Sequence, residues 1–265
     1  MRSWAALALV ALAGPVAAQP ELSADQWVSR MAEALRVGVP MSATAHMEAK
    51  RPGDDPLSFD MEILRDQDGS ATRTLFEMRE KGDTGSTVSE LVVEPGRDLT
   101  NWYWDLRKRR WLSVKGLLAT DPFADTQFRY EDLWLAEPAA RRGGSVRWVE
   151  EDGRRFAELE SPPYHYYQRV VTRVDPETGL PVRVRFYDNA GAKIREQSYE
   201  SILEIEGRPF PSVVRLHDLM TGGESVLTWR SVRFGAAIPA NLFDRSAIDD
   251  RIRKGVDPVP LPPER

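Results

Sequence analysis

The sequence predicts a mainly β fold with helices (α+β), in which an antiparallel meander of strands curls toward a barrel. Apolar and polar residues alternate with a period of two through most of the chain after Pro40. Turn signals such as the one at 188–191 recur between the alternating runs, and one amphipathic helix precedes them. About ten strands are expected, and so many strands curl more readily than they form a flat sheet.

Composition limits the chemistry of the protein. The chain has 265 residues, no cysteine and a formal net charge of -5. Without cysteine there is no disulfide, no thiolate metal site, no cysteine nucleophile and no lipid-modified N-terminal cysteine. The acidic balance gives no overall positive field that would attract nucleic acid. We therefore expect packing alone to hold the fold, with no cofactor and no metal.

The first eighteen residues have the pattern of a secretory signal peptide. Arg2 supplies a positive charge, an apolar run spans residues 4–13, and a small-residue cleavage site follows at 16–18. The run has about half of the roughly 20 residues that span a bilayer, which argues against a membrane anchor. We expect the mature protein to be soluble in the periplasm, without a lipid anchor.

An amphipathic helix is expected over about residues 24–36. Ser23 and Gln26 fit a capping box at its start, and Gly38 follows its end. Large apolar residues recur on one face of this helix: Trp27, Met31 and Leu35. This face must lie on another apolar surface.

The first three predicted strands have one apolar and one polar face. The apolar parity carries Met47, Phe59, Met61, Phe76 and Met78, and we place Trp102 and Trp104 of a later strand at the same parity. Methionine and aromatic side chains suit a surface that accepts a variable apolar ligand. The same residues would equally serve as a core beneath the N-terminal helix, and both interpretations stay open here.

The segment 116–138 lacks strand alternation but is rich in large apolar residues. Such long irregular connections are typically lids or binding loops, and the apolar content argues against disorder. We expect a loop or short helix that covers the mouth of the curled sheet, with an ordinary packed connector as the alternative. Three of its side chains are candidates for burial there: Phe123, Phe128 and Tyr130.

Short motifs follow one another in a fixed order from residue 123 to residue 243. They read F-x4-F-R-Y-E-D-L at 123–133, Y-Y-Q-R-V at 166–170, G-L-P at 179–181, F-Y-D-N-A-G at 186–191 and I-P-x3-F at 238–243. In this order they resemble the LolA-like family of outer membrane lipoprotein-sorting proteins. The relatives tend to carry Gly-Ser-Asp where this chain has Asp125, Thr126 and Gln127, so a role of that carboxylate is not transferred.

The resemblance implies a half-open antiparallel β-barrel, covered by the N-terminal helix and a central helical or loop lid, that holds acyl chains on its concave face. We expect a signal peptide at 1–18, a single LolA-like domain at 19–255 and a proline-rich tail at 256–265.

A carrier of this kind needs an apolar cavity and no nucleophile. The expected partners are lipid or lipoprotein acyl chains and an inner-membrane transporter or outer-membrane acceptor, with the protein acting as a monomeric carrier or chaperone. The basic run 107–110 could touch anionic head groups at a membrane surface, or simply form a soluble hairpin tip. The candidate cavity and lid residues are Trp27, Met31, Leu35, Met47, Phe59, Met61, Phe76, Met78, Trp102, Trp104, Phe123, Phe128 and Tyr130.

Two other functions stay open from the sequence. A related half-barrel could be a sensor of envelope lipid that regulates a protein partner instead of carrying cargo. An acid/base hydrolase would use paired carboxylates such as Glu131 and Asp132, but neighbouring acids are more often solvated. The three histidines have no metal-binding spacing, and the chain has no nucleophile elbow. We therefore do not expect an enzyme.

Overall fold

The computed structural model describes residues 22–68, 71–80, 87–95, 100–105, 110–115, 121–129, 132, 144–163 and 167–254. The predicted signal peptide and the proline-rich tail lie outside these residues, as does most of the basic run 107–110. Over the described residues, no helix has the length and apolar character that a membrane span requires.

The described strands form a single antiparallel sheet of thirteen strands. Their bounds are β1 Met41–Lys50, β2 Leu57–Asp68, β3 Ala71–Glu80, β4 Thr87–Pro95, β5 Thr100–Asp105, β6 Arg110–Lys115, β7 Ser145–Glu151, β8 Arg154–Ser161, β9 Arg169–Val174, β10 Pro181–Tyr187, β11 Lys193–Ile205, β12 Arg208–Asp218 and β13 Gly223–Phe234.

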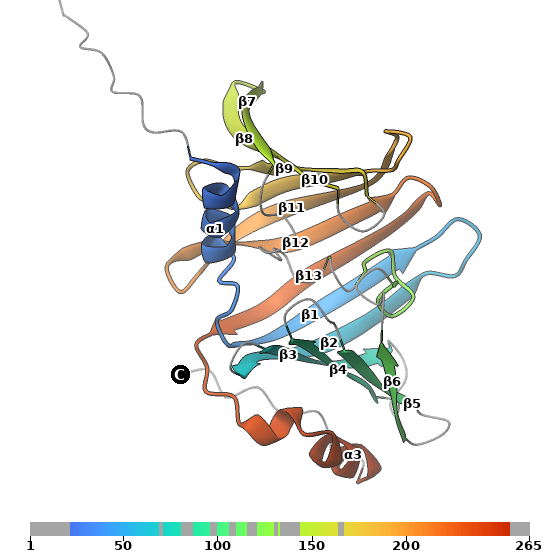
Figure 1. Ribbon diagram of the computed structural model, residues 1–265. Helices are drawn as coiled ribbons and strands as arrows, with labels where there is room; N and C mark the ends of the chain where they lie inside the picture. Colours follow the sequence, from blue (N-terminus) through green and yellow to red (C-terminus); the bar gives the residue numbers. More distant parts are fainter. Residues whose placement is uncertain are drawn as a thin grey trace, which may run out of the picture.

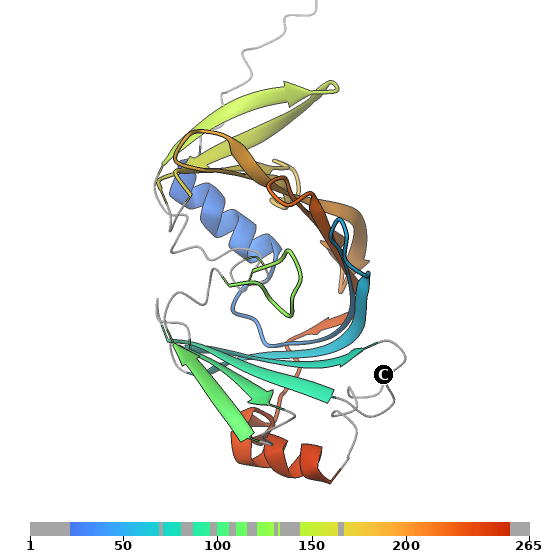
Figure 2. The ribbon, with the colours of Figure 1, turned by 90° about the vertical axis from the view of Figure 1, so that its right-hand side faces the viewer.

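The sheet consists of two meanders that are joined in the middle. The order is β6-β5-β4-β3-β2-β1-β13-β12-β11-β10-β9-β8-β7, so the first and last strands pair with each other at the centre. Figure 2 shows that the sheet bends into an open half-barrel. Strands β6 and β7 follow each other in the chain but form opposite edges. The connection between them must therefore cross from one edge of the half-barrel to the other.

Helix α1, Ala24–Ala34, lies on the concave side of the sheet (Figures 1 and 2). The predicted capping box is confirmed: the Gln26 amide donates to the Ser23 hydroxyl at 3.3 Å, and the Gln26 side chain accepts from the Ser23 amide at 2.8 Å. The helix ends two residues earlier than expected. Leu35 caps it, and Arg36 then takes a left-handed backbone conformation with φ 54°.

A second helix covers the convex side. The 3-10 turn η2, Ala240–Phe243, leads into α3, Arg245–Arg253, whose N-cap Asp244 accepts a hydrogen bond from the Ser246 amide. These elements lie outside the half-barrel beside β3 and β4 (Figure 2). They bury a small group of side chains, the outer cluster, made of Leu64, Leu75, Phe243 and Ile248.

The convex face of the other meander carries charge pairs. Glu158 on β8 is buried and accepts hydrogen bonds from Arg147 on β7 and from Arg173 on β9. Burial alone would raise the pKa of Glu158, but the two arginines outweigh burial and hold this pKa below its ordinary value of 4.5. The network ties three neighbouring strands together on the side away from the core.

The mainly β half-barrel with a helix in its concavity confirms the fold class that the sequence predicts. The strand number does not agree with the sequence-based expectation, since the described residues form thirteen strands where about ten were expected.

Candidate functional site

The concave face of the sheet is lined by methionine and aromatic side chains from neighbouring strands. Met47 on β1 lies opposite Phe59 on β2, and Met61 on β2 lies opposite Met78 on β3. Directly paired residues of an antiparallel sheet point to the same face, so these side chains meet. Together with residues of β8–β13, helix α1 and a central loop, they form one buried group, which we call the inner cluster.

Most of the predicted lining residues belong to this inner cluster and are buried. They are Trp27, Met31 and Leu35 from the helix, Met47, Phe59, Met61, Phe76 and Met78 from the strands, and Phe123 and Phe128 from the loop. The structure thus brings the predicted helix, strand and lid residues together. Their role in ligand binding stays a prediction.

The expectation that Trp102 shares this face is wrong. Leu64, Leu75, Leu91 and Trp102 lie opposite one another in register across β2–β5, and Trp102 packs against the outer cluster on the convex side. A parity that is correct within one strand carries no information about the face of the next strand once a turn intervenes. The side chain of Trp104 and the whole of Tyr130 lie outside the described residues.

Helix α1 is fixed on the concave face by a ring contact and a hydrogen bond. The rings of Trp27 and Trp148 on β7 meet edge to face with centroids 5.9 Å apart. The Arg30 guanidinium donates to the carbonyl oxygen of Pro176 at 2.6 Å, in the turn between β9 and β10. One side of the helix therefore closes the half-barrel near its β7 edge.

Part of the predicted lid crosses the concave side as a compact loop. We call residues 121–129 with Asp132 the crossing loop; no helix forms within 121–129. The Phe123 amide donates to the Phe128 carbonyl at 2.8 Å, and the Thr126 hydroxyl donates to the Phe123 carbonyl at 2.7 Å. Ala124 and Asp125 take left-handed conformations, with φ 46° and 57°, which make the turn tight.

The crossing loop packs onto the inner face of the sheet. Phe123 and Phe128 are both 0% exposed, and the Phe123 ring lies 5.0 Å from that of Phe76 on β3. The backbone amide of Gln127 donates to the Ser225 hydroxyl of β13 at 2.9 Å. Arg51, just after β1, donates to the Asp125 carbonyl at 2.8 Å. The loop therefore contacts both meanders.

Gly223 permits the close approach of the loop to β13. A Cβ atom at this position would lie 2.6 Å from the terminal amide group of the Gln127 side chain. The side-chain amide of Gln127 matches the donors and acceptors around it when its nitrogen donates to the carbonyl oxygen of Glu224 at 2.9 Å. Its side-chain oxygen then accepts from Arg51 at 2.8 Å. Its side chain therefore has no free room to move aside.

A buried arginine joins the crossing loop to β11. Arg195 is 1% exposed, and its guanidinium donates to Asp132 Oδ2 at 2.5 Å, to the Gln127 carbonyl at 2.8 Å and to the Tyr167 hydroxyl. Burial alone would lower the pKa of Arg195, but Asp132 and Tyr167 raise it above its ordinary value, so the guanidinium stays charged. Asp132 also accepts from the Arg129 amide at 2.7 Å.

Sequence reasoning did not find Arg195 or the role of Asp132. The available signal was the alternation within β11, where Arg195 falls on the same parity as Gln197 and Tyr199, both buried. A charged residue at an inward parity requires a buried partner. Arg129 is half-buried, and its guanidinium lies over the Tyr167 ring, 5.8 Å from the ring centroid.

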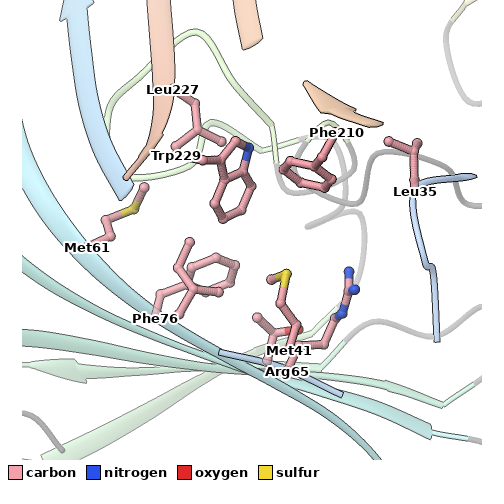
Figure 3. A pocket seen from close by; sticks show the side chains of 10 residues that line it. Leu35, Met41, Met61, Arg65, Phe76, Phe210, Leu227 and Trp229 are labelled. Carbon is pink, nitrogen blue, oxygen red and sulfur yellow. The ribbon is translucent and has the colours of Figure 1, made fainter. Parts of the chain in front are cut away.

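A narrow pocket remains between the inner faces of the two meanders (Figure 3). The space between the atoms of the pocket is about 500 Å³ when the open side is included. The side chains leave only about 20 Å³ of it for the centres of water molecules. That room suits about one or two waters. Ten residues line it: Leu35, Met41, Met61, Ile63, Arg65, Thr74, Phe76, Phe210, Leu227 and Trp229.

The convex face carries a contact that resembles a hydrolase triad. The Ser58 hydroxyl lies 3.3 Å from His46 Nε2, and His46 Nδ1 lies 2.6 Å from Asp60. A working triad also requires backbone N–H groups that are free to bind an oxyanion. His46 pairs with Thr228 and Asp60 in the middle of the sheet, and Asp60 forms an ion pair with Arg230. These contacts describe a surface ion-pair cluster.

Neighbouring acids occur at 131–132, 150–151 and 249–250, and four of these six residues have charged partners in the described part of the chain. Asp132 pairs with Arg195, Glu151 with Arg173, Asp249 with Arg253 and Asp250 with Lys254. Among the described residues, no group of histidine and acidic side chains is arranged to hold a metal ion.

Comparison with known proteins identifies the family. A family model described as "Uncharacterized protein" matches residues 70–250, more than half of the chain. Solved structures with the same half-barrel include a LolA superfamily protein from Nitrosomonas europaea, with a TM-score of 0.66 and 17% identity over 85% of this chain and 99% of the other. The chain belongs to the family that this model describes, and its half-barrel has the LolA-like fold.

Two further structures share this LolA-like fold. A DUF1329 family protein from Desulfovibrio piger has a TM-score of 0.73 and 19% identity over 84% of this chain and 97% of the other. A domain from Vibrio parahaemolyticus, described as an outer membrane lipoprotein-sorting protein domain, has a TM-score of 0.72 and 18% identity over 85% and 98%. No curated protein matches the chain. At these identities the likeness to solved structures establishes the fold.

Proposed function

We propose that this LolA-like protein is a periplasmic carrier or chaperone that binds lipid or lipoprotein acyl chains between the sheet and the crossing loop. The observation that carries the proposal is the inner cluster, an apolar surface rich in methionine and aromatic side chains, which one loop covers with Phe123 and Phe128 and a few polar contacts. A solved domain described as an outer membrane lipoprotein-sorting protein domain shares its fold. A binding protein of this kind needs no catalytic group.

The carrier works outside the cytoplasm under this proposal. Residues 1–18 serve as a cleavable signal peptide, and residues 19–255 form the LolA-like domain that binds cargo. Its partners are an inner-membrane transporter that loads it or an outer-membrane acceptor that receives the cargo. The absence of cysteine from the chain fits a protein that diffuses freely, without a lipid anchor.

The crossing loop must move for cargo to enter. An acyl chain exposed to water costs about 0.8 kcal/mol for each methylene, so a carrier must enclose most of the chain. Binding pockets for ligands of this size enclose roughly 300–1,000 Å³, and the closed pocket has room for little more than a water molecule. Displacement of Phe123 and Phe128 from the inner cluster would open the required space.

Cargo is tested by native mass spectrometry and lipid extraction of protein purified from its own envelope. We expect bound lipid and saturable uptake of a fluorescent acyl probe by the delipidated protein. Reproducible absence of lipid together with no probe uptake would overturn the carrier proposal. Recovery of a stable protein partner in place of lipid would favour the sensor.

Movement of the loop is tested with a reversible lock. The backbone amide of Gln127 lies 2.9 Å from the Ser225 hydroxyl, and its side chain also contacts this hydroxyl, so we expect cysteines at the two positions to be within reach of a disulfide. Since the chain has no cysteine, the double variant Gln127→Cys/Ser225→Cys can form no other disulfide within one molecule. We expect the oxidised variant to lose probe uptake and the reduced variant to regain it. The two single variants are the controls, and equal uptake in both redox states contradicts a moving loop.

A further inference from the structure

The pocket contains a hydrogen-bond donor for which the described residues provide no acceptor. Trp229 on β13 lines the pocket and is 8% exposed, and its indole Nε1 has no hydrogen-bond partner among the described residues. Folded proteins rarely leave a buried donor unpaired, and each exception calls for an explanation. By contrast, Trp111 on the convex side donates from Nε1 to the Arg245 carbonyl at 3.1 Å.

The neighbours of Trp229 provide hydrocarbon and ring surfaces. Its ring meets that of Phe210 edge to face, with centroids 6.0 Å apart and planes at 71°. Figure 3 shows the indole extending from β13 toward Phe76, with its nitrogen on the edge nearer to Phe210. A ring face is a weak acceptor. A carbonyl oxygen that reached this edge would therefore bind the indole N–H more strongly than the protein does.

A second donor lies on the opposite wall of the same pocket. Arg65 on β2 pairs across the sheet with Thr74 on β3, and both line the pocket. Its guanidinium donates to the carbonyl oxygens of Arg36 at 3.3 Å and Val39 at 3.5 Å. Figure 3 shows the Arg65 side chain rising beside Met41 on the side of Leu35. The lining contains no carboxylate, so the pocket offers hydrocarbon together with donors and a positive charge.

We propose that the pocket binds the oxygen-bearing end of its cargo as well as the hydrocarbon chain, and that the carbonyl or carboxylate oxygen accepts a hydrogen bond from Trp229 Nε1. This inference rests on the proposed function, because it names the chemistry of the cargo at the same site. The hydrocarbon tail occupies the inner cluster, and the oxygen lies between Trp229 and Arg65. A free fatty acid and an ester-linked acyl chain both supply this oxygen, and Arg65 favours the charged acid.

The test follows the indole N–H of Trp229 by NMR in the full chain. The signal is assigned by its absence from the Trp229→Phe variant, and three probes are added: hexadecanoic acid, methyl hexadecanoate and hexadecane. We expect the acid and the ester to move the indole signal downfield, as a new hydrogen bond does, and hexadecane to leave it in place. Tighter binding of the acid than of the ester would identify a free carboxylate as the preferred source, tighter binding of the ester would identify an ester carbonyl, and equal binding would contradict a preference set by Arg65.

Affinities provide the second measurement. Trp229→Phe should weaken binding of the acid and the ester about two- to tenfold and leave hexadecane unchanged, because one neutral hydrogen bond is lost. Trp111→Phe, the same substitution on the convex face, is the matched control and should change none of the three affinities. If all three probes bind equally well and the indole signal does not move, the acceptor preference is refuted while the carrier function stands. If none binds, the proposed function itself fails.

Discussion

Replacement of Arg195 by methionine should release the crossing loop. The substitution leaves Asp132 as a buried carboxylate whose ion-pair partner is gone, a change that typically costs about 3–5 kcal/mol. The loop is held mainly by Phe123 and Phe128, whose burial contributes about 1.5–3 kcal/mol each. The cost of the unpaired Asp132 carboxylate is comparable to the free energy gained by burial of both phenylalanine rings. We therefore expect the loop to populate an open state while the sheet stays folded.

Hydrogen exchange measures this local opening separately from global unfolding. The amides of Phe123 and Phe128, which are bonded within the loop, should exchange at least tenfold faster in Arg195→Met, and strand amides should keep their protection. The double variant Arg195→Met/Asp132→Leu removes both charges and should restore most of the protection. Unchanged loop protection, with a loss of stability spread over the whole sheet in urea, would refute the reasoning.

Three further predictions concern stability. Met31→Ala should cost about 2–5 kcal/mol in urea unfolding because it leaves a cavity under α1, whereas Ala at the exposed Glu33 should change little. Gly223→Ala should cost about 1–3 kcal/mol and speed exchange at the Gln127 amide, since the new methyl group collides with that side chain; an unaltered exchange rate would contradict the contact. Because the pKa of Glu158 is lowered in the folded protein, this residue stabilises the fold fully above pH 4.5. This contribution to folding stability is lost as the pH falls through the pKa of the folded state. Glu158→Gln should therefore flatten the acid limb of the stability curve; an acid limb like that of the wild type would argue against the charge network.

The sequence predicts well those features that depend on neighbouring residues. The capping box, the Trp27-Met31-Leu35 face and the apolar parity of β1–β3 depend on local periodicity alone, and the structure has all three. The inward parity of Trp102 failed because a turn resets the face, and only pairing with β4 fixes it.

The polar parts of the site depend on contacts across long stretches of the chain. Arg195 and Asp132 are separated by 63 residues, and Gln127 and Ser225 by 98. No spacing rule connects such positions, because the β1–β13 pairing, which joins the two meanders, brings them together in space. Trp229 illustrates the same limit: the alternation of its strand indicates an inward side chain, but the unpaired Nε1 becomes visible only with the neighbours in place.

The topology explains why the same loop serves as both core and cover. Strands β6 and β7 form opposite edges of the sheet, and residues 121–129, which lie between them in the chain, pack Phe123 and Phe128 into the inner cluster on the concave side. An incoming chain of about fifteen methylenes gains about 12 kcal/mol on burial, more than the roughly 3–6 kcal/mol that Phe123 and Phe128 contribute together. Under the proposed carrier function, opening also separates Asp132 from Arg195, and hydration of the exposed Asp132 carboxylate offsets part of the lost ion pair. A lipid would then have enough differential affinity to favour the open state, while the empty protein stays closed.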